Sequence, residues 1–246
     1  MDIVGLPLSS PAVIADVAAL ATTLGTIVGY HLFLAYKVAH DPNYTFQATM
    51  RRSRAAWTRA IMAEGKDILA VQTLRNSTMA ATFLASTAVL LIIGVLTLSA
   101  QGERLEASWH ALSLTGPAGS AMWTIKTLAL LVDLFSAFLC FTMAIRQFHH
   151  VGYMINVPIS GKYGHIPQEI VISQFERSGR FYWFGMRSYF LLVPLVLWLF
   201  GYVMMLAATA VLLWVLFRLD HMPRGEGEMA QRAEGLDRCG AIEVDA

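Results

Sequence analysis

The chain has 246 residues, of which 56% are hydrophobic and only 14% are charged. A soluble domain of this size carries about 25% charged residues, so the deficit indicates long uncharged stretches and an integral membrane protein. The formal net charge of +1 points to no charged partner. The two cysteines provide neither a disulfide framework nor the spacing of a zinc site.

Four stretches are long and apolar enough to cross a bilayer, for which about 20 residues are needed. They cover residues 11–36, 79–100, 123–145 and 189–217. The sequence therefore predicts an all-α fold, a four-helix membrane bundle in one domain over residues 1–220, with a flexible polar tail over 221–246. The first stretch is interpreted as a retained helix, because its apolar run is too long for a signal peptide.

The segment between the first two spans also has a helical pattern, from Thr45 to about Glu64. Its apolar residues fall near one face and its arginines lie opposite, which predicts an amphipathic helix on the cytoplasmic side. Such a helix can lie in the interface against anionic lipid. A second helix is expected to start near Pro167, ahead of the fourth span.

Lysine and arginine gather in two of the connecting segments, between spans one and two and between spans three and four. The positive-inside rule places these segments in the cytoplasm. An even number of spans then places both termini outside the cytoplasm, in the cell inner membrane. We expect contact with the lipid bilayer, including anionic lipid at the cytoplasmic face, and no nucleic-acid partner, because topology already accounts for the basic residues.

Several short runs carry a family resemblance, and the most specific is Ala70-Val71-Gln72-Thr73-Leu74-Arg75-Asn76. Others are Tyr30-His31-Leu32, Phe148-His149-His150 and Trp183-Phe184-Gly185-Met186-Arg187. The chain resembles, from about Tyr30 to Asp220, a family of bacterial and plant membrane proteins known as a domain of unknown function (number five-nine-nine). The resemblance implies a multi-pass membrane fold. It supplies no activity, cofactor or catalytic residue.

Asp133 lies near the middle of the third predicted span, about 15 Å from its end. A carboxylate at that depth costs at least about 2.5–3.5 kcal/mol on insertion scales, so we expect it to face the bundle interior. One interpretation is a proton or cation site, and the other is a neutral acid that hydrogen-bonds across helices. Nearer the outer interface, Asp16 and Lys126 lie at depths where they can pair, although Lys126 can also extend to the interface.

Three polar residues, Gln72, Arg75 and Asn76, precede the second predicted span on its cytoplasmic side. The forked guanidinium of Arg75 matches the geometry of a phosphate, which makes these residues a candidate site for a lipid headgroup or another anionic ligand. The alternative is that they anchor the helix at the interface.

Histidines are predicted at the cytoplasmic ends of the first and third spans, at His31, His149 and His150. Imidazoles at one level can ligate haem iron or a divalent metal. Adjacent residues of a helix point in different directions, so at most one of His149 and His150 is expected to face His31. The alternative is that all three are hydrogen-bonded interface residues.

Small residues recur at four-residue spacing, at Gly25 and Gly29 in the first span and at Ala81 and Ala85 in the second. Such stripes allow helices to approach closely. They predict helix packing, either within one chain or between copies.

No nucleotide-binding loop, nucleophile elbow or metalloprotease motif is present. We therefore assign no catalytic residue and expect a non-enzymatic membrane component that acts as an oligomer or as an accessory subunit of a larger complex. One alternative is a small ion or proton channel or transporter that uses Asp133. Another is a haem- or metal-binding membrane protein that uses His31 and His150.

Overall fold

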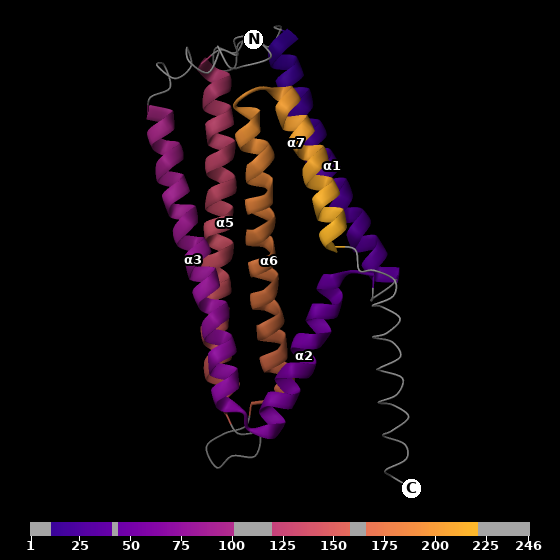
Figure 1. The fold of residues 1–246 in the computed structure, drawn as a ribbon, viewed down its shortest axis with the longest axis vertical. Coiled ribbons are helices and arrows are strands. Elements are labelled where there is room, and N and C mark those ends of the chain that lie inside the picture. The colour runs from indigo at the N-terminus through magenta and orange to yellow at the C-terminus, as the bar shows by residue number, and fades with distance from the viewer. Residues whose placement is uncertain (1–10, 41–43, 101–119, 158–165, 221–246) are drawn as a thin grey trace.

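The computed structural model of the protein describes residues 11–40, 44–100, 120–157 and 166–220. Within these ranges the chain forms helices and no strand, which confirms the predicted all-α class (Figure 1). The helices are α1 (Pro11–His40), α2 (Phe46–Glu64), α3 (Asp67–Ala100), α5 (Ser120–Met154), α6 (Gln168–Trp198) and α7 (Tyr202–Asp220). The tail predicted over 221–246 lies outside the described residues.

Five of these helices are long and apolar enough to cross a membrane, and together they make the chain a multi-pass membrane protein. The structure corrects the span predicted over 189–217, because that stretch belongs to two helices. The chain reverses between α6 and α7, where Gly201 has a φ of 137°, a backbone conformation that favours glycine. The even number of spans on which the predicted placement of the termini depended is therefore not observed.

The helices form two groups (Figure 1). Helices α3, α5 and α6 pack side by side, while α1 runs along α7. Helices α6 and α7 meet at their short turn and diverge toward the opposite end of the molecule, where α2 lies. We call these two ends the turn end and the α2 end.

Helix α2 begins and ends where the sequence predicts. The side chain of Thr45 accepts a hydrogen bond from the backbone N–H of Ala48, which caps the first turn. Gly65 ends the helix in the left-handed conformation, with φ 64°. The apolar face of α2 packs mainly on α6 and also contacts α3, so its buried side chains cover protein.

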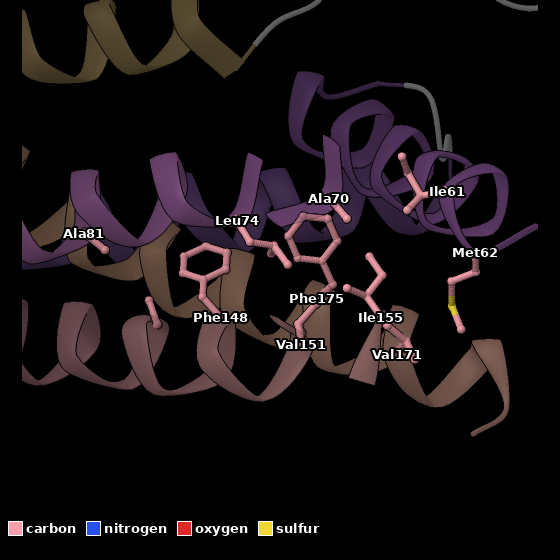
Figure 2. Close-up of a cluster of buried hydrophobic side chains, with 11 residues drawn as sticks. Ile61, Met62, Ala70, Leu74, Ala81, Phe148, Val151, Ile155, Val171 and Phe175 are labelled. Carbon is pink, nitrogen blue, oxygen red and sulfur yellow. The ribbon is translucent and has the colours of Figure 1, made fainter. Parts of the chain in front are cut away.

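At the α2 end the bundle contains a compact hydrophobic core of side chains from α2, α3, α5 and α6 (Figure 2). Helix α5 is about 50 Å long at 1.5 Å per residue, whereas the hydrocarbon layer is about 30 Å thick. Helices α3, α5 and α6 therefore extend beyond the hydrocarbon layer. Leu74, Phe148 and Phe175 face one another in this α2-end core, and the rings of Phe148 and Phe175 lie 6.2 Å apart.

Near the turn end a buried ion pair joins α1 to α5. Lys126 Nζ lies 3.4 Å from a carboxylate oxygen of Asp16, and both side chains are 6% exposed. The indole N–H of Trp198 donates to the other oxygen of Asp16 at 2.9 Å. Of the two alternatives given for Lys126, the structure shows the pairing with Asp16 and not extension to the interface, and Trp198 of α6 completes the contact.

The two small-residue stripes behave differently. Ala81 and Ala85 are buried against α5 and its neighbours. A Cβ added at Gly25 or Gly29 would meet no atom within 4 Å, so no described helix uses that close approach. The glycine stripe therefore does not pack on the alanine stripe within the described chain.

Gly185 marks the closest helix contact at the middle of the bundle. A Cβ at this position would lie 2.8 Å from the ring of Phe141 on α5. We expect Gly185→Ala to lower the stability by about 1–3 kcal/mol, because overpacking shifts the ring or the backbone. Thermal unfolding in detergent measures the effect. Gly94→Ala is the matched control, since nothing lies within 4 Å there; unchanged melting of Gly185→Ala would contradict the expected clash.

The turn-end ion pair predicts a non-additive response to substitution. Asp16→Leu leaves the Lys126 ammonium buried without its partner, and breaking a buried pair in this way costs about 3–5 kcal/mol. Asp16→Leu combined with Lys126→Met removes both charges and should be less destabilised than Asp16→Leu alone. A double-mutant cycle of unfolding free energies tests this. Two losses that simply add would show that the charges do not interact.

Candidate functional site

A cavity of about 690 Å³ lies at the α2 end, enclosed by residues of α2, α3, α5, α6 and α7. Its walls are largely apolar and aromatic, with Phe148, Phe175, Tyr182 and Trp183 among them. A volume in this range and a mainly apolar wall with few polar groups are typical of ligand sites. The charged groups of the lining are Arg54, Arg187 and Asp220.

Asp220, at the end of α7, is held by side chains from two other helices. Arg187 Nη2 on α6 lies 2.5 Å from both carboxylate oxygens. The hydroxyl of Tyr30 on α1 donates to Asp220 at 2.7 Å. The carboxylate is only 5% exposed, so burial and these charge-assisted bonds act together.

The guanidinium of Arg187 has further groups that do not bond to Asp220. It stacks over Trp183, with Cζ 4.7 Å from the ring centroid. Its Nη1 is buried and has no hydrogen-bond partner among the described residues. A buried donor without a partner is rare in native structures, and Arg187 is a residue of the cavity lining.

Arg54 reaches the same cavity from α2. Its guanidinium lies against Gly179 of α6, where a Cβ would be 3.0–3.3 Å from three guanidinium atoms. The glycine thus leaves room for the arginine. Burial lowers the pKa of Arg54 from its usual value, partly offset by the nearby Glu176 carboxylate, and Arg51 adds a small further lowering. Its Nε is buried and meets no hydrogen-bond partner in the described ranges of the chain.

These groups favour an acceptor that carries negative charge. Two guanidiniums and one carboxylate line the cavity, which leaves one excess positive charge. Arginine forks bind phosphate and carboxylate with matched geometry. Aromatic and aliphatic walls around them lower the local polarity, which strengthens such an interaction.

Only one residue of the predicted trio on α3 contributes to this cavity. Asn76 lines it, together with Ser77. Gln72 and Arg75 are exposed and are not part of its lining. The anionic-ligand interpretation made for Arg75 therefore applies better to Arg54 and Arg187.

Asp133 is buried on α5, with 8% of its surface exposed. Its partner is the side chain of Ser188 on α6. Its Oδ2 has no hydrogen-bond partner among the described residues. Another buried polar contact joins Thr23 of α1 to Thr209 of α7, with 3.3 Å between the hydroxyl oxygens.

The predicted histidines do not gather into one cluster. Nδ1 of His31 donates a hydrogen bond to the carbonyl of Ile27 at 2.8 Å, and the His31 ring packs edge-on against Trp183. His149 and His150 are exposed. Among the described residues no group of three His, Cys, Asp or Glu side chains is placed to hold a metal ion. A haem or metal therefore stays a prediction from the sequence.

The sequence reasoning missed Arg54, Arg187 and Asp220 as a site. In the sequence, Arg54 and Arg187 indicate topology and, for Arg187, the family resemblance, but not a site. One available signal was that Arg187 and Asp220 flank a long apolar stretch, where each charge needs a partner. The reversal at Gly201 makes them partners, and without it the two lie far apart.

Comparison with known proteins adds a family and no activity. Neither the curated proteins nor the solved structures include one that matches this chain. The model of one family, described as "Protein of unknown function, DUF599", matches residues 18–224. That range contains all five apolar helices in large part and every charged group of the cavity. The chain therefore belongs to the DUF599 family of proteins of unknown function.

Proposed function

We propose that this protein is a non-enzymatic membrane component that binds an anionic group, a phosphate or a carboxylate, in the α2-end cavity. The observation that carries the proposal is a pair of buried guanidinium N–H groups, Arg54 Nε and Arg187 Nη1, that have no hydrogen-bond partner within the described part of the chain. Both arginines line the same cavity. Leaving such a donor unsatisfied costs about 1–3 kcal/mol, and more for charged groups. An anion between the two arginines would recover this cost.

The position of the cavity favours a lipid headgroup as the source of the anion. Helix α7 is about 28 Å long, close to the thickness of one hydrocarbon layer of about 30 Å. Asp220 and Arg187 therefore lie near one membrane surface when the α6–α7 turn lies near the other. Phosphate groups of lipids lie at that level, which agrees with the anionic-lipid partner expected from the sequence.

The orientation of the bundle is also part of the proposal. With five crossings, Lys and Arg concentrate at the α2 end and in the segments connected to it, including the tail after Asp220. The exceptions are Arg104 and Lys126, which belong to the turn end. The positive-inside rule then places the α2 end and the C-terminus in the cytoplasm and the N-terminus outside.

Association with a second copy or with a larger complex remains compatible with this role. The Gly25-x-x-x-Gly29 face of α1 contacts no other described helix, and such faces support close helix packing in membranes.

A second candidate function, proton or cation passage through Asp133, is favoured by its buried Oδ2, which lacks a partner among the described residues.

The anion site predicts that Arg54 controls the binding of anionic lipid. In nanodiscs or detergent, Arg54→Gln should weaken the binding of phosphatidic acid by about tenfold or more, because a hydrogen bond to a charged group is worth about 1.5–3 kcal/mol. Phosphatidylcholine binding should not change. Native mass spectrometry of the lipid-bound protein measures both affinities, and competition by inorganic phosphate at fixed ionic strength shows whether a free anion suffices.

Arg59→Gln is the matched control. Arg59 lies on the same helix, and its side chain is 53% exposed and pairs with Glu169 at 3.1 Å. Equal losses for Arg54→Gln and Arg59→Gln would assign the effect to general surface charge and overturn the site. Wild-type affinity in Arg54→Gln would do the same.

The proposed orientation predicts the side of each connecting segment. In a bacterial host, a fluorescent protein fused after residue 224 should fluoresce, because the fusion stays in the cytoplasm. Alkaline phosphatase inserted within residues 101–119 should be active, because that segment faces outward. An active phosphatase at the C-terminal site would contradict five crossings in this orientation.

A further inference from the structure

A second hollow, an apolar groove, runs between α6 and α7 and has a volume of about 430 Å³. Residues from Phe190 to Leu197 form one wall, and residues from Met204 to Val215 form the other. The side chains of Val193 and Val211 in these walls are 53% and 62% exposed. The groove is therefore open toward the side of the bundle, where lipid tails surround a membrane protein.

The groove adjoins the charged cavity. Phe190 lines both. On α7, the last groove residue is Val215, and Leu216, the next residue, lines the cavity. The two hollows are thus neighbours along α6 and α7, with arginines in the one at the α2 end and apolar side chains in the one toward the turn end.

The length and direction of the groove match one lipid tail. Met204 and Val215 are eleven residues apart on α7, or about 16 Å at 1.5 Å per residue. One leaflet contributes half of a hydrocarbon layer of about 30 Å. A lipid of the cytoplasmic leaflet has its headgroup at the membrane surface and its tail toward the midplane. The arginines and the groove follow each other in the same order from the α2 end toward the turn end.

We infer that the α6–α7 groove holds an alkyl chain of the anionic ligand, so that the ligand is an anionic lipid that enters sideways from the cytoplasmic leaflet. This inference rests on the proposed function, because the arginines supply the selectivity for charge. The groove itself selects for a ligand that has a tail. Headgroup and tail together distinguish this lipid from the free anions of the cytoplasm and from neutral lipids at the bundle surface.

The experiment uses the full-length protein in nanodiscs that contain a phosphatidic acid with a photoreactive diazirine on one acyl chain. After irradiation, labelled residues are mapped by peptide mass spectrometry. We expect labelling on groove-lining residues of α6 and α7 that unlabelled phosphatidic acid suppresses. Ala207→Trp should reduce this labelling by about tenfold, because the indole fills the groove from an exposed position in its wall.

Ala210→Trp provides the matched control. Ala210 is also an exposed alanine of α7 and is not part of the groove lining. Its variant should label like the wild type. A phosphatidylcholine with the same photoreactive chain should label the groove without saturation, since its headgroup lacks net negative charge.

The possible outcomes separate the two proposals. Saturable labelling elsewhere, or labelling unaffected by Ala207→Trp, would overturn the groove inference, while Arg54-dependent affinity would leave the anion site standing. Saturable labelling by phosphatidylcholine as strong as by phosphatidic acid would show an ordinary lipid contact and overturn the inference. Loss of saturable phosphatidic acid binding in the wild type would remove both proposals.

Discussion

The ion pair between Arg187 and Asp220 is the constraint on which the arrangement of the membrane helices depends. It fastens the free end of α7 to α6, and Tyr30 brings α1 to the same carboxylate. Helix α7 is thus linked to α6 at both of its ends, by the turn at Gly201 and by this pair. The two helices diverge toward the α2 end (Figure 1). Removing one partner would leave an uncompensated buried charge, which is strongly destabilising. The cavity and the groove are both lined in part by residues of α6 and α7 that lie between these two links.

Much of the architecture was predictable from the sequence. The apolar stretches identify the first three membrane helices, and the Thr45 cap and Gly65 stop define α2. The pairing of Asp16 with Lys126 follows from their equal depth. The division of residues 189–217 was not predicted, because a tight turn at a membrane surface can be as apolar as a helix. Gly201 gave the only local signal, and a stretch of 29 residues also fits one tilted helix. Once this turn is missed, the span count changes from odd to even.

The site was less predictable, because it is made by residues that are distant in sequence. Asn76 was one candidate for a ligand site, and the structure places it in the lining of the cavity. Arg75 was a candidate because it lies at the start of an apolar span, whereas in the structure Arg75 is exposed and Arg54 of α2 lines the cavity. That difference depends on how α2 packs on α6, where Gly179 leaves room for the guanidinium. Asp133 was placed correctly in the bundle interior, since the desolvation of a carboxylate leaves it few alternatives.

The turn at Gly201 sets the angle at which two lipid-facing helices separate. A φ of 137° is a torsion that side-chain packing alone does not impose, and residues with a Cβ rarely adopt it. The spacing between α6 and α7 is therefore defined by the backbone at this residue together with the Arg187–Asp220 pair at the other end of α7. Val193 and Val211 line the opening and belong to neither of these two links. In such an architecture, the dimensions of the opening and the chemical preference of its walls are encoded in separate parts of the chain and can evolve independently.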